Sequence, residues 1–269
     1  MFKQEIFHLL TQEYSLKLAT KEDDFDSVKS IRKEILLAKY QSKMLIEDEE
    51  KFLFNEDDEQ SFIYLLRHNK TQRDVGTIRL FFVNPKTPCQ ELPMQKYGNV
   101  KNITEHTETL PICEVSRLAL LNTLPEHPSF SALQLRTSLT IGLMSTIGIN
   151  IFLYPYKNVF SIMDPSLHRI LRRQGINFEA IGEAVDYYGM AVPYAIERRK
   201  LIQESKEILT KLTQYYLNKI TENPKCLYEF IQNNPYLNHD ETKLDKICHC
   251  FKQHGESIPL SLLSKQLEY

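Results

Sequence analysis

Two oppositely charged side chains stand inside an apolar stretch, where charge is costly to bury unless it is paired or put to use. Residues 113–120 read CEVSRLAL, with Glu114 and Arg117 three positions apart. A partly buried carboxylate has a raised pKa and can act as a general base. A structural ion pair between Glu114 and Arg117 or another arginine is the alternative, and the residues alone leave both interpretations open.

The spacing of these two charges sets a geometric condition. Side chains alternate along a regular strand, so residues three apart face opposite sides. A β-bulge near Val115 or Ser116 would bring both onto one face. If Glu114 is the base and Arg117 orients it or the acceptor, the strand must be bulged there. Ser116 is a third catalytic candidate, because its hydroxyl could donate a hydrogen bond. It could equally occupy its position without a catalytic role.

Composition narrows the class of protein. The chain has 269 residues, of which 42% are hydrophobic and 25% charged, with a formal net charge of −2. These values are typical of a globular protein and argue against a uniformly basic nucleic-acid binder, so we expect no nucleic-acid partner. Five scattered cysteines and an N-terminus without a long apolar run favour a cytoplasmic location. The most apolar window, 139–154, is too short and too interrupted to predict a membrane span.

The hydrophobic pattern predicts alternating helices and strands. Helices are expected over 24–46, 131–147, 166–175 and 198–220. Strands are expected over 61–68, 75–83 and 111–120, over either 150–154 or 159–163, and as a pair within 178–196. The acidic stretch 47–60 is interpreted as a solvated loop. This order predicts an α/β (α+β) fold with a mostly antiparallel sheet flanked by helices, in a domain over 1–196 followed by a helical extension over 197–269.

Several motifs, taken in order, resemble one family. VGTIRL, a Pro-containing loop with ELP, CEVSRLAL, MDPSLHRILRRQGINFEAIG and VDYYGMAVPYAI follow one another. Over roughly 5–196 they resemble acyltransferases with the Gcn5-related N-acyltransferase fold. The branch is that of N-acyl amino acid synthases and exosortase-associated acyltransferases, to which acyl-homoserine lactone synthases are related. The resemblance implies an acyltransferase that moves a long-chain fatty acyl group to the amine of an amino acid or similar small acceptor.

The donor implied by the resemblance is a thioester of an acyl carrier protein or of coenzyme A, with no permanently bound cofactor. The loop before the central helix, LNTLPEHPSFSA, lacks the glycines with which acetyl-coenzyme-A users of this fold bind pyrophosphate, so both donors remain open. Homoserine lactone synthases typically use tryptophan in the acceptor region, and this chain has no Trp, so the resemblance favours an amino acid or amine acceptor over S-adenosylmethionine. An apolar product would permit peripheral contact with a membrane. The motif CHCFKQH (248–254) lacks a second pair of ligands, and we expect no metal.

The resemblance also assigns residues to the acceptor side. They are Arg32 on the first long helix and, before the first hairpin, Asp58, for which a surface salt bridge is the alternative. Arg79, a strand arginine between Ile78 and Leu80, needs a partner and is a third candidate.

Two further groups concern the acyl donor. An apolar slot for the acyl chain could be lined, unless they form an ordinary core, by Leu139, Leu143, Met144, Ile147, Phe152, Tyr154, Phe160 and Ile162. Both carriers are acidic, and the locally basic residues that could bind them, unless they are a solvated helix face, are Arg136, His168, Arg169, Arg172 and Arg173. Three hypotheses follow: an N-acyltransferase, an autoinducer synthase using S-adenosylmethionine, or a protein that binds acyl groups or acyl carriers without turnover.

Overall fold

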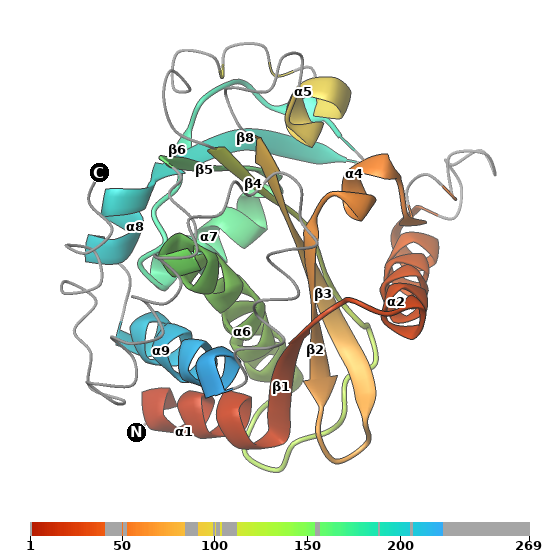
Figure 1. Ribbon diagram of the computed structural model, residues 1–269, viewed down its shortest axis with the longest axis vertical. Coiled ribbons are helices and arrows are strands. Elements are labelled where there is room, and N and C mark those ends of the chain that lie inside the picture. Colours follow the sequence, from red (N-terminus) through yellow and green to blue (C-terminus); the bar gives the residue numbers. More distant parts are fainter. Residues whose placement is uncertain are drawn as a thin grey trace.

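One twisted sheet crosses the centre of the computed structural model (Figure 1). The structure describes residues 2–40, 50, 53–83, 91–98, 100, 103, 112–153, 157–187, 189–204 and 207–222. Among them, eight strands pair in the order β1-β2-β3-β4-β5-β8-β6, with β7 also on β8. The strands are β1 Tyr14–Leu18, β2 Phe62–His68, β3 Arg73–Val83, β4 Ile112–Leu120, β5 Asn158–Met163, β6 Glu179–Ala180, β7 Val185–Asp186 and β8 Met190–Glu197.

The pairing of β4 with β5 differs from every other pairing in this sheet. It is parallel, whereas the other pairs are antiparallel. The ladder holds only Cys113 opposite Val159 and Glu114 opposite Phe160. Because β4 runs on to Leu120, the backbone ladder between the two strands ends at Glu114, and one residue further on only the Ser161 hydroxyl of β5 donates to the Val115 carbonyl, at 2.7 Å. The candidate base of the sequence analysis therefore stands where the sheet opens.

Helices cover both faces of this sheet (Figure 1). They are α1 Phe2–His8, the π-helix η1 Leu9–Glu13, α2 Glu22–Tyr40, α4 Glu56–Glu59, α5 Pro93–Gly98, α6 Ala132–Leu153, α7 Pro165–Arg173, α8 Arg198–Glu204 and α9 Glu207–Glu222. The long apolar α6 packs on β2, β3 and β4 from one side, where its Asn150 donates to the Tyr64 hydroxyl at 3.0 Å. From the other side α2 packs on β3 and β4, and α4 packs on β3.

Two hydrophobic clusters lie in the described part of the chain. The larger joins α6, α9, α1 and the central strands. The smaller lies beside β3, β4 and β5 under α5, and its buried members are Phe81, Val83, Leu92, Met94, Ile103, Ile112, Phe160, Ile162 and Ala191. Glu114 belongs to this second neighbourhood, because its register partners Phe81 and Phe160 are both in it.

Helix α9 packs tightly against α6 and α1. A Cβ added at Gly148 of α6 would lie 2.2 Å from Thr213 Oγ1 of α9, so only glycine permits this approach. The hydroxyls of Tyr215 and Tyr216 donate to the carbonyls of Thr11 and Leu10 at 3.0 and 2.8 Å. The described part of the helical extension is thus continuous with the main core, and the domain boundary at 196–197 stays a prediction.

The expected elements and the observed ones differ at identifiable places. Residues 150–153 are helical and not a strand, because Asn150 donates to the Thr146 carbonyl at 2.8 Å and remains inside α6. The alternative strand, 159–163, is confirmed by β5. The sequence analysis did not predict α1, η1 or β1. No described helix is long and apolar enough to cross a membrane.

Candidate active site

A single helical turn, α4, holds two neighbouring carboxylates in place. Its N-cap is a reciprocal capping box in which Asn55 Oδ1 accepts from the Asp58 amide at 3.2 Å and Asp58 Oδ2 accepts from the Asn55 amide at 3.1 Å. Asp57 and Asp58 are both buried. The expectation of a solvated loop over 47–60 is therefore wrong at 56–59, because the cap closes a helical turn onto the sheet.

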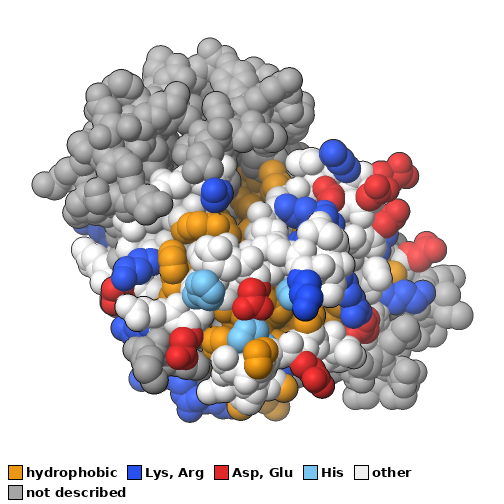
Figure 2. Space-filling model, turned by 90° about the horizontal axis from the view of Figure 1, so that it is seen from below, with side chains coloured by type: hydrophobic (Ala, Val, Ile, Leu, Met, Phe, Trp, Pro, Cys, Tyr) orange, Lys and Arg blue, Asp and Glu red, His pale blue; other side chains and the backbone are white. Residues whose placement is uncertain are grey.

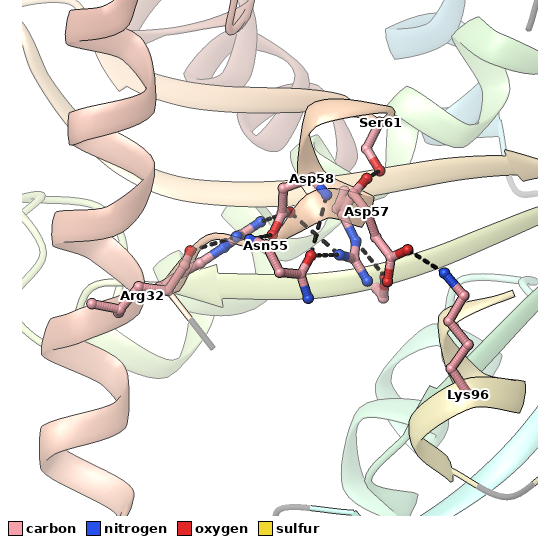
Figure 3. Close-up of polar contacts among 9 residues, drawn as sticks. Arg32, Asn55, Asp57, Asp58, Ser61 and Lys96 are labelled. Carbon is pink, nitrogen blue, oxygen red and sulfur yellow. Dashed lines mark hydrogen bonds and ion pairs between the residues drawn. The ribbon is translucent and has the colours of Figure 1, made fainter. Parts of the chain in front are cut away.

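Asp58 lies between two buried guanidinium groups (Figure 3). Its Oδ1 accepts from Arg32 Nη2 at 2.9 Å and lies 3.3 Å from Arg79 Nη1. All three side chains are at most 2% exposed, so Asp58 is no surface ion pair. Arg32 Nη1 also donates to the Leu53 carbonyl at 2.7 Å. The three acceptor-side candidates are thus one buried network that joins α2, α4 and β3.

Burial and ion pairing have opposite effects on the pKa values of this network. Burial acts to raise the pKa of Asp58, but Arg32 and Arg79 outweigh it and hold that pKa below its ordinary value. Burial lowers the pKa of Arg32 to about 10, while Asp58 acts to raise it. At neutral pH the network therefore contains two cations and one anion, and it attracts further negative charge.

Glu114, on β4, is a further buried carboxylate on which this network acts, through Arg79. The side chain is fully buried, and its Oε2 accepts from the Met94 amide of α5 at 2.7 Å. Its Oε1 has no hydrogen-bond partner. Burial raises the pKa of Glu114, opposed by Arg79, the Met94 amide and the Ser116 hydroxyl and reinforced by Asp57. A buried carboxylate with a raised pKa and one open oxygen is a candidate general base.

A bulge in β4 supplies the geometry that the sequence required. Thr77 and Arg79, two residues apart on β3, pair with Ala119 and Ser116, three residues apart on β4. Arg117 sits at this extra position with φ of 55°, a left-handed conformation. The expectation of a bulge is confirmed, and it lies just beyond Ser116.

The charge of Arg117 acts on the acceptor-side network. It acts to lower the pKa values of both Arg32 and Asp58, so it is close enough to influence them. The groups that most strongly affect Glu114 are instead Arg79, the Met94 amide and Ser116. A role for Arg117 in orienting the acceptor fits this placement better than a role in holding Glu114, and both stay predictions.

Arg79 links the network to Glu114. Register places Arg79 opposite Ser116 and Phe81 opposite Glu114, so all four side chains share one face of the sheet. Arg79 Nε donates to Ser116 Oγ at 3.1 Å, while its Nη2 has no partner. On α4, Asp57 Oδ2 is likewise buried without a partner. Glu114 Oε1, Asp57 Oδ2 and Arg79 Nη2 are therefore open polar atoms around this network, as is Arg32 Nε.

The sequence analysis missed part of this site. It did not name Asn55, Asp57, Met94 or Lys96. Lys96 Nζ lies 2.6 Å from Asp57 Oδ1, which ties α5 to α4 (Figure 3). The spacing of Asn55 and Asp58 in NEDD is that of a capping box and was the available signal. No sequence pattern near Lys96 indicates its role, because its partner, Asp57, is 39 residues away in the chain.

The candidate acyl-lining residues do not form one group. The four candidates on α6 are buried in the larger cluster: Leu139, Leu143, Met144 and Ile147. Phe160 and Ile162 belong to the smaller cluster beside Glu114. The side chain of Phe152 and the whole of Tyr154 lie outside the described residues. Of the predicted set, Phe160 is the one that the β4–β5 ladder pairs with Glu114.

The candidate carrier-binding residues also separate. Arg136 donates to the carbonyls of Leu121 and Leu120 at 2.8 and 3.4 Å, so it caps the end of β4. The His168 ring stacks on Tyr194 at 4.3 Å, and its Nε2 lies 2.9 Å from the Phe178 carbonyl. The exposed members of the group are Arg169, Arg172 and Arg173 on α7.

Surface charge elsewhere is mixed. On the face seen from below, positive and negative side chains are interspersed around a few histidines and apolar side chains (Figure 2). Across the described ranges, no group of three His, Cys, Asp or Glu side chains could hold a metal ion. The motif CHCFKQH lies outside those ranges.

The fold of this chain recurs among solved structures. FeeM, an N-acyl amino acid synthase from uncultured soil microbes, has a TM-score of 0.51 and 16% identity, covering 71% of this chain and 94% of that one. The AHL synthase LasI has a TM-score of 0.51 and 12% identity, with the same coverage of each chain. No family model and no curated protein sequence matches. The chain therefore has the expected Gcn5-related N-acyltransferase fold, and its chemistry must be argued from the residues above.

Proposed function

We propose that this protein transfers a fatty acyl group from a thioester to the amine of a small acceptor, with Glu114 as the general base. One observation carries the proposal. Glu114 is a fully buried carboxylate at the point where β4 and β5 separate, with Oε2 held by the Met94 amide and Oε1 without a partner. A purely structural acid would be expected to have both oxygens satisfied, because an unpaired buried acceptor destabilises the fold.

The open atoms around Glu114 favour an α-amino acid as the acceptor. Glu114 Oε1 and Asp57 Oδ2 can accept hydrogen bonds from an amine. Arg79 Nη2 can donate to a carboxylate, which suits the excess positive charge of the Arg32–Asp58–Arg79 network. An amino acid carries both groups on one carbon, so it offers donors for the carboxylate oxygens and an acceptor for the guanidinium nitrogen.

The reaction then follows from these placements. The acceptor binds as an ammonium, loses one proton to bulk water, and transfers a second to Glu114 Oε1 as its nitrogen attacks the thioester carbon. The carbonyl oxygen becomes negative in the tetrahedral intermediate, and we place it at the opening between β4 and β5, where backbone N–H groups of the bulge can face it. The carbon–sulfur bond breaks, the thiolate takes a proton, and the products are an amide and a free thiol.

We place the acyl donor at the same opening, next to Glu114. Phe81 and Phe160 flank Glu114 and offer an apolar surface for the first carbons of the chain. At the start of α6, Ser131 and Gln134 form a reciprocal cap that already uses two of the amides. Phosphate recognition is therefore assigned to the exposed arginines of α7, which suit the arm of either coenzyme A or an acyl carrier protein.

A thiol-release assay tests this function. The protein is incubated with long-chain acyl thioesters of coenzyme A and of an acyl carrier protein, together with a pool of amino acids. We expect thiol release that depends on an amino acid and a matching N-acyl amino acid by mass spectrometry. Release only with S-adenosylmethionine, accompanied by methylthioadenosine, would instead identify an autoinducer synthase. Binding of acyl thioester without any release would identify a protein that has lost turnover.

A further inference from the structure

Two residues of helix α5, Met94 and Lys96, attach this helix to the candidate active site. The Met94 amide donates to Glu114 Oε2 at 2.7 Å, and two residues later Lys96 Nζ lies 2.6 Å from Asp57 Oδ1. Lys96 Nζ also lies 5.8 Å from the centre of the Phe81 ring. The Met94 side chain is fully buried in the smaller cluster. A six-residue helix has little stability of its own, so these contacts determine where it lies.

The two carboxylates that α5 contacts have different places in the site: Asp57 adjoins the acceptor-side network, and Glu114 is the proposed base. Asp57 is on α4, whose next residue, Asp58, binds the acceptor-side arginines. Glu114 is on β4. Helix α5 therefore connects the acceptor network to the base through one ion pair, Lys96 with Asp57 (Figure 3), and one backbone hydrogen bond, from Met94 to Glu114.

We propose that Lys96 and Asp57 are positioning residues, whose ion pair holds α5 so that the Met94 amide fixes Glu114 Oε2 and leaves Oε1 as the oxygen that takes the proton. The inference rests on the proposed function of Glu114. It assigns different tasks to the two oxygens of one carboxylate. A base held by one oxygen can rotate little, which keeps the other aimed at the amine.

The pKa of Glu114 can distinguish this proposal from a direct effect of the Asp57 charge. Of the charged and titratable groups near the site, Arg79 on β3, Asp57 on α4 and the Cys113 thiol on β4 interact with Glu114 directly. Arg32 on α2, Asp58 on α4 and Arg117 on β4 interact within the acceptor-side network, and Lys96 on α5 pairs with Asp57. The negative charge of Asp57 by itself raises the pKa of Glu114, so removing that charge should lower the pKa. Loss of the Met94 hydrogen bond, which favours the ionised form, should raise it. Asp57→Asn therefore gives opposite results under the two interpretations.

The test is a carbon-13 titration of the Glu114 carboxyl, assigned as the signal that disappears in Glu114→Gln. It needs no substrate. We expect Asp57→Asn to raise the pKa of Glu114 by about one unit, the size of one lost hydrogen bond to a charged group. A pKa that stays the same or falls would overturn the proposal. The matched control is Lys200→Met, which removes an exposed ion pair of the same 2.6 Å length with Glu179.

A second variant keeps the test decisive if Asp57→Asn folds poorly. Lys96→Met should release the Met94 amide, seen as faster hydrogen exchange at Met94, and Lys96→Arg should restore slow exchange. Unchanged exchange at Met94 in Lys96→Met would also overturn the proposal. In turnover, Lys96→Met should lower kcat about tenfold with little change in KM. If wild-type turnover does not depend on Glu114, the proposed function itself fails, whatever the result of the titration.

Discussion

Asp57 and Asp58 are adjacent in the chain but bind opposite sides of the site. Asp58 Oδ1 lies 2.9 Å from Arg32 Nη2 of α2, and Asp57 Oδ1 lies 2.6 Å from Lys96 Nζ of α5. A single capped turn thus joins two helices that cover one face of the sheet.

The Asp58 carboxylate should be important for stability. Asp58→Asn leaves two buried arginines without their shared anion, and removing one partner of a buried ion pair typically costs about 3–5 kcal/mol. Urea unfolding of wild type and variant measures the difference. Asp26→Asn, in an exposed pair with Lys29, serves as the control and should change stability little. Equal midpoints for wild type and Asp58→Asn would show that the buried network contributes nothing.

The contribution of Asp58 should depend on pH in a defined direction. Its pKa in the folded state lies below the ordinary value of 3.8, so the unfolded chain binds the proton first. The stabilisation is present above about pH 4 and is lost as pH falls through the folded-state pKa. The difference in unfolding free energy between wild type and Asp58→Asn should therefore shrink in acid. A difference that grows as the pH falls would contradict the assignment.

Glu114 should show the opposite trend in stability together with a gain in activity. Its folded-state pKa is raised above 4.5, so relative to Glu114→Gln the wild type loses stability as pH rises from about 4.5 through that pKa. Over the same interval kcat/KM should rise, because only the ionised carboxylate can accept the proton. Parallel pH series of urea unfolding and of initial rates measure both effects. An acid limb that persists in Glu114→Gln would assign it to another group.

Packing between α6 and α9 should tolerate no added methyl group. Gly148→Ala places Cβ 2.2 Å from Thr213 Oγ1, and overpacking of this kind typically costs about 1–3 kcal/mol, although alanine favours the helix by about 1 kcal/mol. Thr213→Ala should relieve the clash, so the double variant should be more stable than the sum of the single effects predicts. Thermal unfolding of all four proteins gives the coupling. Additive effects would show that α9 does not pack as closely as described.

The exposed arginines of α7 should act on the carrier and leave chemistry unchanged. Arg169→Glu and Arg172→Glu should raise KM for the acyl donor, more strongly at low salt, with kcat nearly constant. The control Lys211→Glu changes a lysine on α9, remote in the sequence from α7. Initial rates at varied donor concentration and ionic strength measure the effect. Equal KM values for the arginine variants and the control would remove α7 from the donor site.

Much of the fold could be predicted from the sequence because its strands are local in pattern. The β-branched and aromatic runs over 61–68, 75–83 and 111–120 correspond to β2, β3 and β4. Asp164 and Pro165 mark the start of α7, and the Asp164 side chain does accept from the Ser166 amide, at 2.6 Å. The end of α6 was harder to predict. Gly148 and Asn150 are ordinary stop signals, but tertiary contacts with Thr213 and Tyr64 keep them inside the helix.

The site was predictable only where its residues have a sequence signature. Glu114 stands out as a charge in an apolar strand, and the bulge follows from its spacing to Arg117. Asp57, by contrast, appears in a run of acids that reads as solvated, and its burial arises from a cap and from a lysine far away in the chain. The second oxygen of Glu114 is fixed by a backbone amide, which no side-chain pattern can reveal.

The central claim is that Glu114 Oε1 accepts the proton of an amine during acyl transfer. Mass spectrometry of lipid extracts from cells overproducing wild type, Glu114→Gln or the exposed control Glu183→Gln tests it most directly. The account predicts an N-acylated amine in extracts of wild type and Glu183→Gln, and a loss of about a hundredfold or more in Glu114→Gln. The same amount of product from folded Glu114→Gln would contradict it.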